Sequence, residues 1–174
     1  MMIMNNFNFI IILYNKMANY NKLNFRRNDD IPTPLDIWKE LEDFIPKDKK
    51  IWCPFYYNGE LTLKKINNNI IHTQENFYEY EPEEYDLIID NPPFSCIPDI
   101  FKRLFELDKP FLIILPISKL RTKYSRKYLK DRKNITIIYP SYRFNFLKDK
   151  KSSCGFETIA LTYKMNLKKE NIWI

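Results

Sequence analysis

The sequence predicts an α/β fold built on a mostly parallel central sheet. Short runs of apolar, often β-branched residues alternate along the chain with segments whose apolar residues recur at helical spacing. Such alternation is typical of strands joined by crossover helices. A late alternating segment, residues 154–164, is interpreted as an antiparallel strand, so the sheet would close with a C-terminal antiparallel hairpin. The 174 residues suit one minimal domain with a sizeable core.

Six stretches have the character of strands. The two clearest, residues 85–90 and 110–116, are continuous apolar runs, which is typical of strands buried on both faces. Pro54 ends the first strand, because proline cannot donate a hydrogen bond to a sheet. The predicted strands cover residues 50–55, 69–73, 85–90, 110–116, 134–140 and 154–164.

Helical segments lie between these strands. Residues 33–45 repeat apolar side chains near helical spacing, with Thr33 placed as the N-cap and Pro34 at the first helical position. Residues 97–108 carry their apolar side chains on one face, and residues 118–131 are rich in Lys and Arg. The predicted helices cover residues 33–45, 59–66, 97–108 and 118–131, of which 59–66 is the weakest.

Charge and residue usage narrow the function. Lys and Arg outnumber Asp and Glu by 28 to 22, and the net charge of +6 mildly favours a polyanionic partner. The three cysteines, Cys53, Cys96 and Cys154, are widely spaced, and His72 is the single histidine. This pattern does not fit a zinc site or a disulfide framework. We therefore expect no metal and a reducing, intracellular compartment.

The N-terminal segment differs from the rest of the chain. Its apolar run, residues 7–14, is too short to cross a membrane, and no basic residue precedes it as in a signal peptide. We therefore expect neither secretion nor a membrane anchor. Residues 1–28 are interpreted as an N-terminal arm or extension, with Met17 as an alternative start, and residues 29–174 as the folded domain. An edge strand covering the core is the other interpretation of the arm.

The segment Asn91-Pro92-Pro93-Phe94 directly follows the predicted strand 85–90. Its two prolines fix the backbone and remove two donors, which leaves the Pro92 carbonyl free to accept a hydrogen bond. The Asn91 side-chain carbonyl offers a second acceptor beside it. Two adjacent acceptors suit an NH₂ group on a flat base, and Phe94 offers a face for stacking. A plain proline turn with a packed aromatic is the alternative, and the preceding apolar strand favours the binding site, because ligands of parallel sheets lie beyond strand carboxyl ends.

In this context, the segment 91–94 resembles the catalytic motif of amino-directed methyltransferases that use S-adenosyl-L-methionine, in particular the adenine-N6 DNA methyltransferases. Weaker matches follow in the order expected for that family. They are DDIPTPLDIWKEL, IWCPFYYNGE, IIHTQENFYEY, KPFLIILP and the closing hairpin YRFNFLKDKKSSCGFETIALTY. The resemblance covers roughly residues 29–164 and implies a Rossmann-like methyltransferase fold.

The resemblance also implies a catalytic set, made of Asn91, Pro92, Pro93 and Phe94. Asn91 and the Pro92 carbonyl would hold the target amine, and Phe94 would stack on the flipped base. Hydrogen bonds to both acceptors would localise the nitrogen lone pair, which would attack the sulfonium methyl in line. The base would be extruded from a duplex or taken from a single strand.

The resemblance assigns the cofactor, S-adenosyl-L-methionine, to the first strands. Thr33 and Pro34 would border it, and the backbone near Gly59 would approach its methionine end. Asn76 would face the adenine amine, with Phe77 stacked on the ring. Glu75 or Gln74 would sit near the ribose hydroxyls. The implied cofactor contacts are Thr33, Pro34, Pro54, Phe55, Gly59, Glu75, Asn76, Phe77 and Asp90.

The sequence also departs from the family pattern. The family usually carries two or three glycines after the first strand, where this chain has only Gly59, and Cys53 replaces the usual acidic residue. The stretch 59–90 is short, and no extended target-recognition region is present. We interpret the chain as a minimal domain, for which a protein partner or a homodimer would supply target recognition. A degenerate, inactive relative is the alternative.

Residues 119–133 contain eight basic residues and one acidic residue. Lys119, Arg121, Lys123 and Arg126 are therefore candidate contacts to nucleic-acid phosphates, with DNA favoured over RNA. A solvated helix with its tyrosines packed inward is the alternative. Two functions follow from these observations: an adenine-N6 DNA methyltransferase, with an RNA base as the variant substrate, or a non-catalytic methyltransferase-like nucleic-acid-binding or scaffold subunit.

Overall fold

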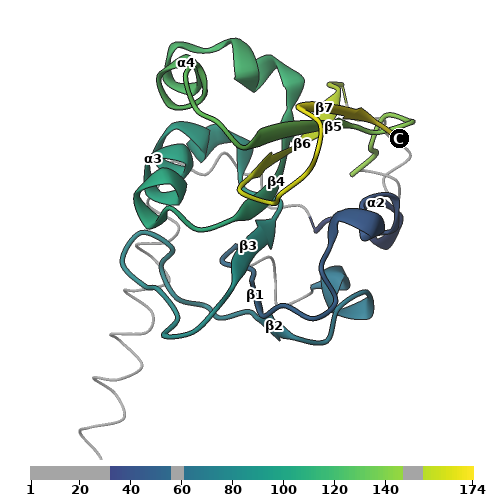
Figure 1. Cartoon of the computed structure of the whole chain (residues 1–174). Helices are drawn as coiled ribbons and strands as arrows, with labels where there is room; N and C mark the ends of the chain where they lie inside the picture. Colours follow the sequence, from purple (N-terminus) through teal and green to yellow (C-terminus); the bar gives the residue numbers. More distant parts are fainter. Residues whose placement is uncertain (1–31, 56–60, 147–154) are drawn as a thin grey trace, which may run out of the picture.

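A computed structural model of the chain describes residues 32–55, 61–146 and 155–174. In these ranges the chain forms a seven-stranded mixed sheet with helical segments on both faces (Figure 1). The strands lie side by side in the order β2-β1-β3-β4-β6-β5-β7. The predicted α/β class is confirmed. The predicted N-terminal arm, residues 1–28, lies outside the described ranges, as do Gly59 and Cys154.

All six predicted strands are present, and each is shorter than expected. A seventh, β7, pairs with the edge of β5 and was not predicted. The strands are β1 (Ile51–Trp52), β2 (Ile70–Ile71), β3 (Leu87–Asp90), β4 (Phe111–Pro116), β5 (Ile135–Tyr139), β6 (Thr158–Tyr163) and β7 (Asn171–Trp173).

One strand runs against its neighbours. β1 is parallel to β2 and β3, and β3 is parallel to β4. β6 is antiparallel to both β4 and β5, with Thr158 opposite Pro116 at one end of the β4 pairing. The antiparallel strand predicted at residues 154–164 is therefore confirmed as β6. Its preceding antiparallel neighbour in the chain is β5, which lies before the stretch 142–163 that the family resemblance implied for the closing hairpin.

Two of the predicted helices are interrupted. Residues 33–45 divide at Leu41, and residues 118–131 divide at Thr122. The helical segments are α2 (Leu35–Glu40), η1 (Glu42–Phe44), η2 (Thr62–Lys65), η3 (Phe94–Cys96), α3 (Ile97–Leu107), η4 (Ile117–Arg121) and α4 (Lys123–Leu129), where η denotes a 3₁₀ helix.

The predicted N-cap at Thr33 is wrong. Pro34 occupies that position with an extended backbone, φ −57° and ψ 148°, and no side chain caps the helix. Thr33 lies one residue earlier, where its side chain is buried and its carbonyl accepts a 2.5 Å hydrogen bond from the Thr62 hydroxyl. This contact with η2 holds Thr33 outside the helix.

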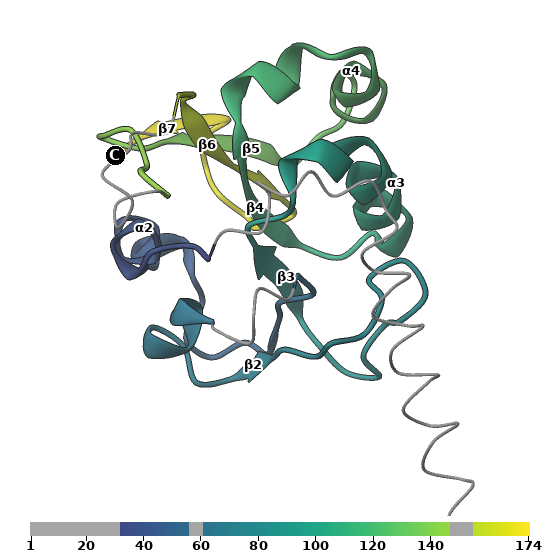
Figure 2. The same cartoon turned by 180° about the vertical axis from the view of Figure 1, so that it is seen from behind.

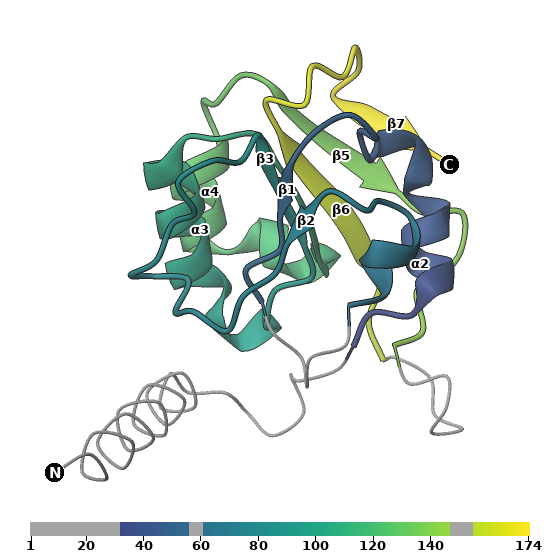
Figure 3. The same cartoon turned by 90° about the horizontal axis from the view of Figure 1, so that it is seen from below.

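Alternating side chains of the strands supply two cores, one on each face of the sheet. Figure 3 shows α3 and α4 on one side of the strands and α2 on the other. In β4, Phe111, Ile113 and Leu115 face the core beneath α3, while Leu112 and Ile114 face the core beneath α2. This double burial explains the continuous apolar run in the sequence. Helices α3 and α4 thus cover one face and α2 the other, as the view from behind also shows (Figure 2).

The direction of the chain reverses at β1. From β1 the chain moves outward to β2, and it then returns to the opposite side of β1 as β3. In open α/β sheets this reversal is the topological switch point, and ligands bind beyond the carboxyl ends of the strands that flank it. The carboxyl ends of β1 and β3 are therefore the expected place for a site. No helix in the described ranges is both long and apolar enough to cross a membrane.

Candidate functional site

Asn91, Pro92, Pro93 and Phe94 lie immediately beyond the carboxyl end of β3. The Pro93 carbonyl accepts a 3.1 Å hydrogen bond from the Cys96 N–H, which starts the turn into α3. Among the described residues, no group donates to the Pro92 carbonyl. Asn91 is only 5% exposed, so its side-chain amide sits in a low-dielectric setting that strengthens its hydrogen bonds. The segment is thus a rigid, buried turn in which one backbone acceptor has no donor among the described residues.

Asp90 ties the ends of β1 and β3 together. Its Oδ2 accepts a 2.8 Å hydrogen bond from the Phe55 backbone N–H, and its Oδ1 accepts a 2.8 Å hydrogen bond from the Asn91 N–H. Burial raises the pKa of the Asp90 carboxyl to about 7, although both backbone donors act in the opposite direction. Because both oxygens are engaged, Asp90 organises the two turns. These two hydrogen bonds hold backbone groups of the protein, and they give no support to the cofactor contact that the family resemblance implies for Asp90.

The turn after β1 is buried. The Cys53 thiol donates a 3.0 Å hydrogen bond to the Ile89 carbonyl, and burial, followed by the charge of Asp90, raises the pKa of this thiol well above its ordinary value. Pro54 and Phe55 are buried as well. Cys53 is therefore a neutral packing residue, where the family pattern has an acid. The Gly59 position, expected to approach the cofactor, is outside the described ranges.

The segment after β2 reaches the same sheet edge. Glu75 is exposed, and the Asn76 side-chain oxygen accepts a 3.1 Å hydrogen bond from the Tyr78 N–H. Phe77 is 1% exposed and packs against Phe55, with ring centroids 5.1 Å apart. Phe77 therefore supports the turn after β1 from within the core, and its ring has little open face for a stacked adenine.

His72 and Thr33 lie at the margins of this edge. The His72 ring nitrogen Nδ1 is 2.9 Å from the Cys53 carbonyl oxygen, and burial lowers the pKa of the ring. This contact ties the end of β2 to the turn after β1. Thr33 and Pro34 are held beside η2, as described above. Among the described residues, no three His, Cys, Asp or Glu side chains gather as metal ligands would.

Phe94 is half-buried, whereas an exposed stacking face was expected. Its ring packs edge-on against Phe146 at 6.2 Å and against Phe156 at 5.5 Å between centroids. Phe156 is 39% exposed. Neither aromatic partner of Phe94 was predicted. Antiparallel pairing of β6 with β4 brings residue 156 to the carboxyl end of β4, beside the end of β3. An aromatic cluster therefore borders the candidate site.

The basic segment forms two short helices that meet at Thr122. Tyr124 and Tyr128 turn inward against α3, where Tyr128 stacks on Phe105 with centroids 5.5 Å apart. The inward tyrosines match the alternative interpretation of this segment. The four predicted phosphate contacts divide between η4, with Lys119 and Arg121, and α4, with Lys123 and Arg126.

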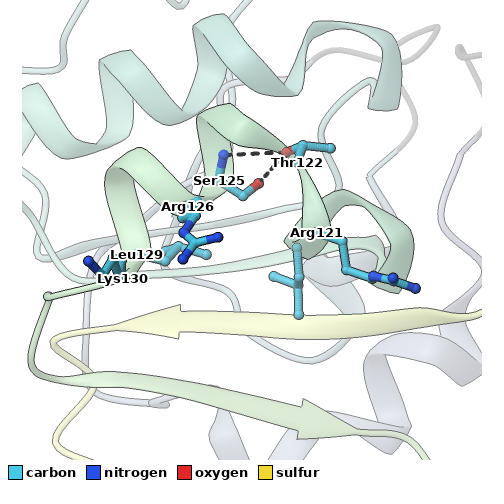
Figure 4. Close-up of a pocket in the computed structure, with 7 residues that line it drawn as sticks. Arg121, Thr122, Ser125, Arg126, Leu129 and Lys130 are labelled. Carbon is cyan, nitrogen blue, oxygen red and sulfur yellow. Dashed lines mark hydrogen bonds between the residues drawn. The ribbon is translucent and has the colours of Figure 1, made fainter.

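A hollow of about 440 Å³ opens between η4 and α4. Figure 4 shows Arg126 from α4 with Lys130 directly after it, and Arg121 from η4 with its side chain directed away from these two. Lys119 and Lys123, the other two predicted phosphate contacts, do not line the hollow. Its lining residues are Leu120, Arg121, Thr122, Ser125, Arg126, Leu129 and Lys130.

No family model matches the sequence, and no curated protein matches it significantly.

Proposed function

We propose that this protein is a methyltransferase that transfers a methyl group from S-adenosyl-L-methionine to the N6 amine of adenine in DNA. The single observation that carries the proposal is the position of Asn91–Phe94. This segment begins at the carboxyl end of β3, beside the switch point, and Asp90 joins it to the end of β1. The sheet, with one reversed strand between β4 and β5, supports a Rossmann-like methyltransferase fold with a short edge.

The proposed chemistry depends on two acceptors held at fixed positions. The Asn91 side-chain oxygen and the Pro92 carbonyl would each accept one N–H of the target amine, which weakens delocalisation of its lone pair into the ring. The nitrogen would then attack the methyl carbon as the carbon–sulfur bond breaks, and the bonding pair would return to sulfur. The proton lost from nitrogen would pass to solvent. The protein contributes position and polarisation, and no strong base is required.

The residues present fit the cofactor in part. Parallel pairing of β1 with β2 places Trp52 opposite Ile71, so the turns that follow these strands reach one edge of the sheet. The exposed Glu75 would accept hydrogen bonds from the ribose, and Asn76 would meet the adenine. Pro54 and Phe55 would form the floor of the site. Two residues fit the cofactor less well: Cys53 stands where the family usually has an acidic residue, and the Phe77 ring is buried.

A non-catalytic nucleic-acid-binding or scaffold subunit is the second candidate. Two observations favour it: Asn91, Pro92 and Pro93 are buried, and Cys53 is a neutral packing residue. Under this function the turn after β3 would be structural only. Under both candidate functions, the basic hollow between η4 and α4 would contact nucleic acid.

Transfer of a labelled methyl group decides between these functions. Purified protein is incubated with labelled S-adenosyl-L-methionine and, separately, with duplex DNA, single-stranded DNA, RNA or protein. We expect label at adenine N6 in DNA. Label only in RNA would redirect the proposal to an RNA base. If calorimetric titration detects no cofactor binding, even with DNA present, the methyltransferase proposal is overturned and the non-catalytic scaffold subunit is favoured.

A further inference from the structure

The residues that line the hollow between η4 and α4 indicate the charge of the ligand it would bind. Arg121, Arg126 and Lys130 bring three positive charges from two helical segments, and Leu120 and Leu129 supply an apolar part of the wall. No Asp or Glu lines it. At about 440 Å³ it has the size of a small-ligand site and exceeds what one ion needs.

The three cations are available to a ligand. Within the described ranges, none of Arg121, Arg126 and Lys130 forms an ion pair with a carboxylate. All three side chains are exposed at the surface. A bound anion would therefore pair with them without displacing a carboxylate of the described residues.

The two hydroxyl groups in the hollow are already engaged. Thr122 and Ser125 lie 2.9 Å apart between their hydroxyl oxygens, and both hydroxyls reach the Lys119 carbonyl, at 2.8 and 2.5 Å. Figure 4 shows this pair at the junction of the two helices. Because the carbonyl and the partner hydroxyl take their protons, the hydroxyls offer little to a ligand. Recognition in the hollow therefore rests on positive charge.

The lining also lacks the side chains that read base edges. Asn, Gln, Asp and Glu are the residues that pair with adenine or cytosine, and none of them lines the hollow. Arginine can read guanine, but lysine and arginine without such partners most often contact phosphate oxygens. A ligand with repeated negative charge fits this set better than a base does.

The η4 wall of the hollow begins at the same edge of the sheet as Asn91. Helix η4 starts directly after the carboxyl end of β4, and β4 is the parallel neighbour of β3. We infer that the hollow binds the sugar-phosphate backbone of the nucleic acid and does so independently of base sequence. The inference rests on the nucleic-acid partner of the proposed function and names the part of that partner which this surface contacts.

Salt dependence of binding, measured without cofactor, tests the inference. Affinity for a labelled DNA duplex is measured by fluorescence anisotropy across a series of KCl concentrations. The variant Arg126→Gln with Lys130→Gln should flatten the log–log slope by about two, since each lost phosphate contact removes about 0.9. The control Lys127→Gln with Lys133→Gln removes the same charge from the same segment outside the hollow, and should flatten it by less than about one.

Several other results of this experiment would overturn the inference or assign the hollow to another ligand. Equal losses in the two variants, or a wild-type protein that does not bind duplex DNA, would overturn the inference. A loss confined to one of two duplexes of unrelated sequence would overturn it too, because it indicates base reading. Stronger loss of binding to poly-glutamate than to DNA would assign the hollow to an acidic protein. If a double variant melts earlier than wild type, Arg126→Gln against Lys127→Gln gives the same comparison.

These outcomes are separate from those of the proposed function. A protein that never transfers a methyl group can still show the expected salt slopes, and Asn91→Ala should leave them unchanged. Failure of the slopes with methyl transfer intact would overturn only the role of the hollow.

Discussion

The backbone N–H of Phe55 donates a 2.8 Å hydrogen bond to Oδ2 of Asp90, and this bond joins the turn after β1 to the turn after β3. The same carboxyl accepts from the Asn91 N–H through its other oxygen. One buried side chain therefore fixes the relative position of the proposed cofactor edge and the proposed catalytic turn. Because burial raises its pKa to about 7, its charge changes near neutral pH.

Asp90 should make stability fall as pH rises. Its pKa is near 3.8 in the unfolded chain and about 7 in the folded protein, so the folded protein holds the extra proton between these values. The stability that this proton provides is complete below pH 4 and is lost as pH rises to 7. The loss is at most about 1.4 kcal/mol for each pH unit.

Urea unfolding of wild type and Asp90→Asn across this pH range measures the effect. The amide of the variant cannot ionise, so the difference between the two free energies of unfolding isolates the carboxyl. The wild-type advantage should shrink from pH 4 to pH 7 and stay constant above it. An advantage that stays constant or grows from pH 4 to pH 7 would mean that the pKa of Asp90 is not raised in the folded protein.

Phe77→Ala should destabilise the fold. The ring is 1% exposed and packs on Trp52 and Phe55, so its removal should cost about 3–5 kcal/mol in the free energy of unfolding. Chemical denaturation measures this cost. A loss below about 1 kcal/mol would show that the ring is not packed in the core.

The matched variant Phe77→Leu separates packing from cofactor binding. Leucine keeps most of the buried volume and removes the aromatic face. If Phe77 also stacks on the cofactor adenine, as the family resemblance implies, Phe77→Leu should weaken S-adenosyl-L-methionine binding by about 1–3 kcal/mol in calorimetry. Unchanged affinity would limit Phe77 to the supporting role that its burial indicates.

Thr122→Ala should weaken the start of α4. The Thr122 hydroxyl oxygen accepts a 3.3 Å hydrogen bond from the Ser125 N–H and occupies the N-cap position. Its loss should cost about 1 kcal/mol in thermal or urea unfolding, as for other N-caps. Thr122→Ser keeps the hydroxyl and serves as the control. Equal destabilisation by both variants would place the cost on the lost methyl group.

The main strands were predictable because burial on both faces leaves a clear mark on the sequence. The strands predicted at 85–90 and 110–116 are β3 and β4, whose residues are all buried. The break at Thr122 was missed because basic residues with helical propensity continue on both sides of it. β7 was missed because Asn171–Trp173 is short and largely exposed, and its parallel pairing with β5 depends on contacts distant in sequence.

The candidate site was predictable only in its local part. Asn91–Phe94 could be placed because a turn must follow a buried strand, and proline fixes that turn. The partners of Phe94 could not, because Phe146 and Phe156 follow no periodic pattern and meet Phe94 only through the antiparallel return of β6. The link from Asp90 to Phe55 uses a backbone N–H, which leaves no trace in residue identity.

Asn91→Ala should slow methyl transfer by at least about 10²-fold, as for loss of one preorganised polar contact. The substitution removes one of the two acceptors proposed for the amine and keeps the Pro92 carbonyl. It also keeps the Asn91 backbone N–H that donates to Asp90, so the turn should stay in place. Single-turnover kinetics measure the transfer step, and calorimetry measures cofactor affinity, which should change little.

The role of Asn91 follows from comparing the loss in transfer rate with the change in cofactor affinity. Asn91 is buried, so alanine also leaves a small cavity, and the cost of unfolding must be measured beside the kinetics. A slow transfer step with near-normal stability and cofactor binding would place Asn91 at the reacting amine. Wild-type turnover in Asn91→Ala would reduce Asn91–Phe94 to a proline turn between β3 and α3, and the methyltransferase proposal would then lose the observation that carries it.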